Sequence, residues 1–158
     1  MRQLNQAGQD LLQFWEKRSQ VVYLDQAGLG TGGWGHRTDL PVGTELTDDQ
    51  IAQWWTEDVD TACSGVEDAM NGDTSELNDN QFGAEVVFAF NIGDRAFQGS
   101  TVLKDVLTND LPDVPAAMLM WSHIHDPNTG ALIVSNGLLN RRNAEIALFN
   151  TPVSDGSS

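Results

Sequence analysis

The fold is decided by residues 16–36, which read EKRSQVVYLDQAGLGTGGWGH. Upstream of this stretch, five apolar residues recur at helical spacing: Leu4, Leu11, Leu12, Phe14 and Trp15. They predict a helix over residues 4–18. The period then changes, because residues 21–23 are strand formers and residues 28–35 contain five glycines. This change predicts a small antiparallel sheet with tight turns directly after the first helix.

Downstream of this stretch the pattern is helical. Thr47 with Gln50, and Asn78 with Gln81, have the spacing of capping boxes and mark two helix starts. The spacing of apolar residues predicts helices near 47–70, 78–92, 100–109, 112–121 and 137–149, with a polar loop at 122–136. The helix at 78–92 is apolar nearly all round, so we expect it to be central.

These elements predict an α+β fold. An N-terminal helix and a small antiparallel sheet pack on a larger helical lobe, with a substrate groove between the two lobes. Residues 1–150 form the one expected domain, and residues 151–158 form a flexible C-terminal tail.

The charge excludes several classes of function. Asp and Glu number 23 against 8 Lys and Arg, which gives a net charge of −15. Nucleic-acid binding and attraction to anionic lipid both need clustered basic residues, and no segment supplies them. No apolar run is long enough for a membrane anchor, and the first residues lack the apolar core of a signal peptide. Cys63 is the one cysteine, so no internal disulfide forms.

Two short motifs resemble ligand sites but lack the surrounding sequence that such sites need. Gly28, Gly30 and Gly33 match the spacing of a dinucleotide fingerprint, but the glycines that follow break the helix such a site must open. His123 and His125 alternate as metal ligands on a strand do. Pro127 and Gly130 instead favour a turn-rich, solvated loop, and nothing places a third ligand. We therefore expect no metal and no cofactor.

A carboxyl pair is the strongest candidate for chemistry. Glu16 ends the first helix beside Trp15, where apolar neighbours favour the protonated form of a carboxyl. Asp25 enters a glycine turn that leaves it solvated, and Thr31 follows between two glycines. Glycosidic cleavage uses one protonated and one ionised carboxyl. On spacing alone, the better interpretation is that Glu16 is a surface acid at a helix end and Asp25 an ordinary turn residue.

The full motif is Glu16, then Tyr23-x-Asp25-x-x-Gly28-x-x-Thr31-x-Gly33-x-Gly35-His36. It resembles the signature of phage-type lysozymes, glycoside hydrolase family 24. The resemblance continues through Asn80-Gln81-Phe82, Phe88-Ala89-Phe90-Asn91-Ile92-Gly93 and Gly137-Leu138-x-x-Arg141-Arg142. It covers about residues 5–149, nearly the whole chain.

The resemblance implies a lysozyme-like fold and an endolysin, a glycoside hydrolase that degrades bacterial peptidoglycan. It would cleave the β-1,4 bond between N-acetylmuramic acid and N-acetylglucosamine. Glu16 would be the general acid, with Asp25 and Thr31 positioning the attacking water. Phe90, Asn91 and Ser100 match groove positions that contact sugar, although Phe90 equally fits a helix core. We expect a monomer, made in the host cytoplasm and acting on the wall after its release.

Other interpretations remain open at this point. One is a catalytically idle lysozyme-fold module that binds glycan or protein; another is a transglycosylase on the same scaffold. Arg141 and Arg142 fit either an exposed helix face or a pairing with a site carboxylate. His36 is expected to make a structural hydrogen bond. The acidity departs from the family, many of whose members are basic.

Overall fold

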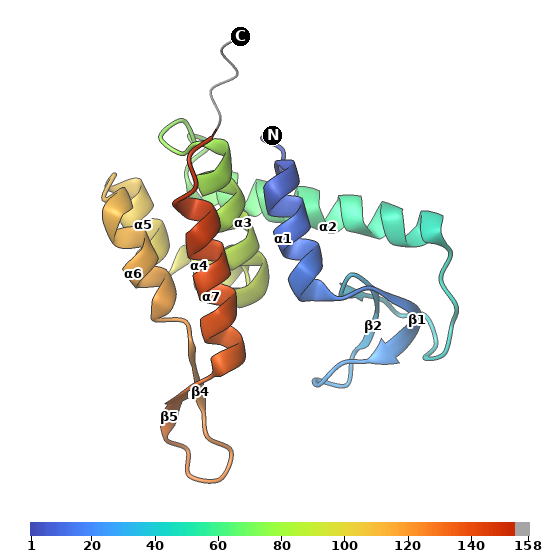
Figure 1. Cartoon of the computed structure of the whole chain (residues 1–158). Coiled ribbons are helices and arrows are strands. Elements are labelled where there is room, and N and C mark those ends of the chain that lie inside the picture. The colour runs from blue at the N-terminus through green and yellow to red at the C-terminus, as the bar shows by residue number, and fades with distance from the viewer. Residues whose placement is uncertain (154–158) are drawn as a thin grey trace.

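The computed structural model describes residues 1–153, which form two lobes joined by one long helix (Figure 1). The small lobe is a three-stranded antiparallel sheet, in the order β1 (Ser19–Leu24), β2 (Gly30–Gly33) and β3 (His36–Arg37). Helix α1 (Gln6–Glu16) leads into this sheet, and α2 (Asp48–Ala69) runs from it towards the helical lobe. The predicted α+β class is confirmed.

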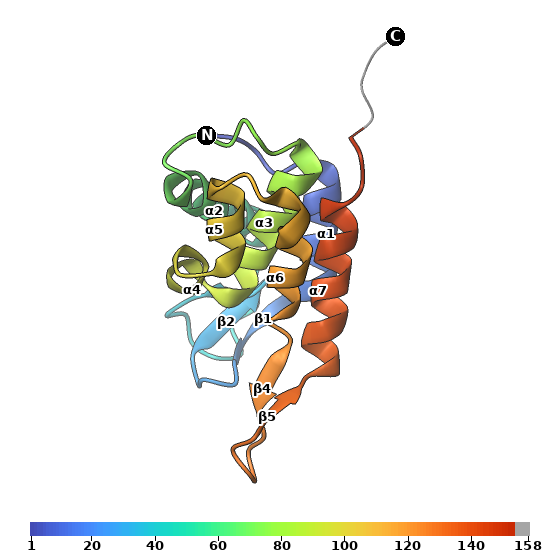
Figure 2. The ribbon, with the colours of Figure 1, turned by 90° about the vertical axis from the view of Figure 1, so that its left-hand side faces the viewer.

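The helical lobe is built around α3. It contains α3 (Asp79–Ile92), α4 (Asp94–Gln98), α5 (Thr101–Leu107), a 3-10 helix (Leu111–Asp113), α6 (Val114–Leu119) and α7 (Asn136–Phe149). Helix α3 packs against α1, α2 and α7, and its residues 82–89 are all buried, as its apolar sequence predicts (Figures 1 and 2). A complete capping box at Asn78 and Gln81 starts it. Cys63 of α2 is fully buried in the same core.

A separate, smaller cluster attaches the sheet to α2. Its buried members are Val22, Leu46, Ile51 and Trp54. Two glycines of β2 are required by this packing: a Cβ at Gly30 would lie 2.5 Å from the Thr38 carbonyl oxygen, and one at Gly32 would lie 2.6 Å from Leu46 Cδ1. The glycines therefore serve the close approach of neighbouring chain segments.

The segment expected to be a polar loop contains a second sheet. Strands β4 (His123–His125) and β5 (Leu132–Val134) pair antiparallel, and the hairpin projects beyond the helices in Figure 2. Asp126 holds the turn by accepting hydrogen bonds from the backbone N–H groups of Asn128 (2.7 Å) and Thr129 (3.0 Å). The five-residue helix α4 was not predicted either.

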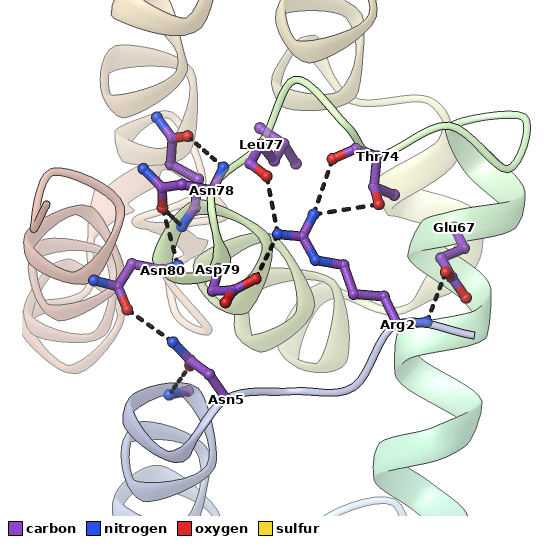
Figure 3. Close-up of polar contacts among 10 residues, drawn as sticks. Arg2, Asn5, Glu67, Thr74, Leu77, Asn78, Asp79 and Asn80 are labelled. Atoms are coloured by element: carbon purple, nitrogen blue, oxygen red, sulfur yellow. Dashed lines mark hydrogen bonds and ion pairs between the residues drawn. The ribbon is translucent and has the colours of Figure 1, made fainter. Parts of the chain in front are cut away.

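The two ends of the described chain are tied to the start of α3. The Arg2 guanidinium donates to the carbonyl oxygens of Thr74 and Leu77, both at 2.9 Å, and to Asp79 Oδ1 at 2.7 Å (Figure 3). Asn80 donates to the Thr151 carbonyl oxygen at 2.9 Å. Residues 154–158 of the expected tail lie outside the described residues. Within residues 1–153, no helix combines the length and apolar character that crossing a membrane requires.

Candidate active site

Glu16 lies where the helical lobe meets the sheet. It is the last residue of α1, and Lys17 ends the helix with a φ of 45°, which turns the chain into β1. The Glu16 side chain is 19% exposed, and Arg141 Nη2 of α7 donates to its Oε1 at 2.8 Å. A Cβ at Gly35 would lie 3.5 Å from Glu16 Oε2, so the glycine-rich segment passes close to the carboxyl. The surroundings of Glu16 are thus more polar than its apolar helix neighbours predict.

Asp25 is held by the turn between β1 and β2. Its Oδ1 accepts hydrogen bonds from the backbone N–H groups of Ala27 (2.8 Å) and Leu29 (2.9 Å). Gly28 makes this turn possible with a φ of 77°. Asp25 is half-buried, less solvated than its glycine turn predicts.

Thr31 lies opposite Tyr23 in the β1–β2 pair and is only 5% exposed. Its hydroxyl donates to the Leu29 carbonyl oxygen at 3.1 Å. The hydroxyl oxygen keeps its lone pairs, so it can still accept a hydrogen bond from a water or a sugar. One hairpin therefore carries both Asp25 and Thr31, and Glu16 precedes its first strand.

The two arginines are buried, so the exposed-face interpretation is wrong. Arg141 is 7% exposed and Arg142 is 0% exposed. Arg141 contacts Glu16, as described, and Arg142 Nη2 donates to Asn91 Oδ1 at 2.7 Å. The structure instead shows the other alternative, a pairing with a site carboxylate, between Arg141 and Glu16.

Glu145 holds both arginines and was missed in the sequence. Its Oε1 accepts from Arg142 Nη2 at 2.8 Å and from Arg141 Nε at 3.3 Å, and its Oε2 lies 2.8 Å from Arg142 Nε. The spacing of three and four residues from the arginines was the signal that could have identified it. Burial raises the pKa of Glu145, although the two guanidinium groups oppose this effect.

A second buried carboxyl, Glu85 of α3, was also missed. It is 0% exposed, and neither of its oxygens has a hydrogen-bond partner among the described residues. Burial, reinforced by the nearby charge of Glu145, raises the pKa of Glu85 to about 8. A carboxyl in this environment is neutral at pH 7.

The expected sugar-contacting residues are dispersed. Phe90 lines a hollow of about 800 Å³ between the sheet and the helical lobe, together with Gly35, His36 and Gly93. Asn91 is half-buried and bonded to Arg142. Ser100 caps α5 by accepting from the Leu103 N–H at 3.1 Å and lines a different hollow of about 430 Å³. Sugar contact by these three residues stays a prediction.

The larger hollow is lined by acidic side chains of α2 and α4, together with Arg37 of β3. Four aspartates line it: Asp58, Asp60, Asp68 and Asp94. His36 Nδ1 lies 3.0 Å from both carboxylate oxygens of Asp58, and its ring stacks on Trp54 at 4.3 Å, so His36 has the structural contact expected of it. Within residues 1–153, no group of three or more His, Cys, Asp or Glu side chains is arranged to hold a metal ion.

The arrangement of the lobes places the protein in the lysozyme-like class of α+β proteins. The structure is similar to the muramidase domain of SpmX from Asticaccaulis excentricus, with a TM-score of 0.85 and 28% identity. The match covers 96% of this chain and 100% of the SpmX domain. An endolysin from Escherichia coli O157:H7 phage FAHEc1 matches 94% of each chain, with a TM-score of 0.81 and 31% identity.

The chain belongs to the phage lysozyme family, whose model matches residues 13–145. Among its relatives is an endolysin of Acyrthosiphon pisum secondary endosymbiont phage 1, which is 31% identical over 149 residues. That match covers 94% of this chain and 98% of the relative.

Proposed function

We propose that the protein is a phage endolysin that hydrolyses bacterial peptidoglycan. Its bond would be the β-1,4 linkage between N-acetylmuramic acid and N-acetylglucosamine. Family membership supports the general activity. The observation that carries the proposal is the Glu16 carboxyl, which Arg141 holds close to Gly35 in the β2–β3 turn of the same small lobe that carries Asp25 and Thr31.

In this mechanism Glu16 protonates the glycosidic oxygen of the leaving sugar. Asp25 keeps one oxygen bonded to the turn, and its carboxylate orients a water molecule or stabilises positive charge developing on the sugar ring. Thr31 accepts a hydrogen bond from the same water. No step of this acid–base chemistry requires a metal or an organic cofactor.

The site of action follows from the substrate. We expect synthesis in the host cytoplasm and action on the wall after the membrane has been permeabilised. The glycan strand would occupy the hollow beside Gly35, with Phe90 as an apolar platform for a sugar ring.

Mass spectrometry of digested peptidoglycan tests the proposal. Hydrolysis leaves muropeptides with reducing ends, whereas 1,6-anhydro ends would show transglycosylation and undigested wall would show a binding module. Glu16→Gln should lower turnover by at least 10²-fold, because the amide cannot donate an acid proton. Asp10→Asn, an exposed carboxyl change on the same helix, is the matched control. Near-normal activity of a folded Glu16→Gln protein would contradict the assignment.

A further inference from the structure

Arg141 is held at both ends of its guanidinium group. Its Nη2 donates to Glu16 Oε1 at 2.8 Å, while its Nε donates to Glu145 Oε1 at 3.3 Å. The group is planar and rigid, so the bond at Nε determines the direction in which Nη2 points. Arg141 is 7% exposed and Glu145 is 0% exposed, so bulk water cannot replace Glu145 as the acceptor.

Glu145 also sets the position of Arg142. The same Oε1 accepts from Arg142 Nη2 at 2.8 Å, and Arg142 then donates to Asn91 Oδ1 at 2.7 Å. A single buried carboxyl on α7 therefore orients two cations, one directed at α1 and the other at the end of α3. Removing it would leave two adjacent buried arginines without their shared partner, which is a costly arrangement.

We propose that Glu145 is a positioning residue for Glu16: acting through Arg141, it determines how the guanidinium charge is placed against the carboxyl that donates the proton. Glu145 itself touches no sugar, because it is fully buried between helices. This inference rests on the proposed function of Glu16.

The charged groups around Glu145 are few and can be separated. Arg141 and Arg142 lie on its own helix, Glu85 faces it from α3, and Glu16 of α1 is reached through Arg141. Helix α6, which also packs on α7, has no charged residue. Glu85 has the same side chain and the same 0% exposure as Glu145 but no hydrogen-bond partner within residues 1–153, so Glu85→Gln is a matched control.

The charges around Arg141 give the pH dependence a direction. Above neutral pH, an ionised Glu145 shares the positive charge of Arg141 with Glu16. In Glu145→Gln this second negative charge is missing, and Arg141 acts on Glu16 alone. The alkaline limb of the rate profile should then move down by about one pH unit, because a positive charge that is no longer shared favours a negative charge beside it more strongly.

The experiment measures kcat and KM on soluble peptidoglycan fragments from pH 4 to 9 at constant ionic strength. Glu145→Gln should move the alkaline limb down and reduce kcat about tenfold or more with little change in KM. Glu85→Gln should leave the limb in place up to about pH 7, because Glu85 is mostly protonated below that pH. Equal loss of activity in both variants without any movement of the limb would show a merely structural role and overturn the inference.

Glu145→Asp covers the case in which the glutamine variant does not fold, as judged by circular dichroism. It keeps the charge but shortens the side chain, so the limb should stay in place while kcat falls. Normal kcat in Glu145→Asp would overturn the inference. The two proposals fail differently: an active Glu16→Gln protein contradicts the function, whereas an inactive Glu16→Gln with an unmoved limb in Glu145→Gln contradicts only the role of Glu145.

Discussion

At Thr31, a single hydroxyl links the packing of the hairpin to the proposed chemistry. Its proton is committed to the Leu29 carbonyl oxygen at 3.1 Å, so towards substrate it acts as an acceptor. The residue is 5% exposed, which leaves little room for a larger side chain. Shape and hydrogen bonding at this position can therefore be tested separately.

We expect Thr31→Ser to keep most of the activity and Thr31→Val to lose about tenfold or more in kcat. Valine preserves the shape but removes the hydroxyl donor to the Leu29 carbonyl oxygen, which still accepts from the Asp25 N–H, and it offers no acceptor to water. Steady-state kinetics with thermal melts measures both effects. Thr38→Val, in the same lobe, is the control. Equal activities of the serine and valine variants would show that the hydroxyl has no role in turnover.

Glu85 makes a second prediction at the scale of one residue. Its pKa is raised from 4.5 to about 8 in the folded protein, so the folded state binds a proton that the unfolded state releases. The stabilisation is complete below about pH 4.5 and is lost as the pH rises towards 8. Across this range the group lowers the free energy of unfolding by about 1.4 kcal/mol per pH unit.

Glu85→Gln should flatten this slope, because the amide does not ionise. Urea unfolding at pH 5, 6.5 and 8 would measure it, and the variant should gain stability relative to the parent as the pH rises. The exposed Glu76→Gln provides the comparison. Parallel pH profiles for the parent and Glu85→Gln would mean that the buried carboxyl is not protonated in the folded state.

At the scale of elements, the sequence predicted what depends on local pattern. Helix α3 was found because it is apolar all round and has a capping box at Asn78, and the small sheet was found because strand formers precede a glycine-rich stretch. The hairpin of β4 and β5 was missed because its strands are three residues long and surround a polar turn at Asp126. Strands this short have too few residues for an alternating pattern to be detected.

In the candidate site, too, residues within one local motif were predicted and residues that depend on the tertiary fold were not. Glu16, Asp25 and Thr31 were proposed from spacing within a continuous motif. Pairing of Arg141 with Glu16 joins residues 125 positions apart, which no local pattern can determine. Glu85 and Glu145 were missed because charged residues are normally counted as exposed, and these two are buried.

The N-terminal segment makes a prediction at the element scale. Arg2 joins it to the α2–α3 connection through four hydrogen bonds and packs 4.6 Å over the Phe82 ring (Figure 3). Arg2→Ala should lower the free energy of unfolding by about 2 kcal/mol. Arg2→Lys should recover less than half of this free energy, because an ammonium group cannot contact at once the several acceptors that the planar guanidinium group reaches.

Chemical denaturation measures these changes, and Arg18→Ala is the control. Arg18 pairs with the exposed Asp48, and a surface pair of this kind contributes less than about 1 kcal/mol. A lysine variant as stable as the parent would indicate that charge alone, and not the geometry of the fork, holds the segment.

At the scale of the whole molecule, burial leaves the formal net surface charge at the −15 of the sequence, because the buried Arg141 and Arg142 are offset by the buried Glu85 and Glu145. Of the eight Lys and Arg residues, Arg141 and Arg142 are buried in ion pairs. They cannot form a basic patch for an anionic wall. The hollow beside Gly35 is lined instead by four aspartates. Attraction between protein and wall is therefore weak in the region where the glycan is expected.

We expect both wall lysis and melting temperature to rise from low to moderate salt. Added ions shorten the Debye length from about 30 Å at 0.01 M to about 3 Å at 1 M, which screens the repulsion from the wall and within the protein. Turbidity assays and thermal melts across a salt series measure both. Activity on a short neutral chitin-type oligosaccharide should change much less. A steady fall of lysis with salt would require basic surface contacts to dominate wall binding.

Because Cys63 is buried, the reactivity of its thiol can report how often the helical core opens. This single thiol is fully enclosed, and burial raises its pKa to about 11, so very little reactive thiolate exists near pH 8. An alkylating reagent can reach it only during an opening that separates α2 from the rest of the helical core. The rate of labelling, divided by the rate for an unfolded peptide, therefore gives the opening equilibrium directly under native conditions. The opening equilibrium can be followed in the same sample while salt is added or peptidoglycan is bound.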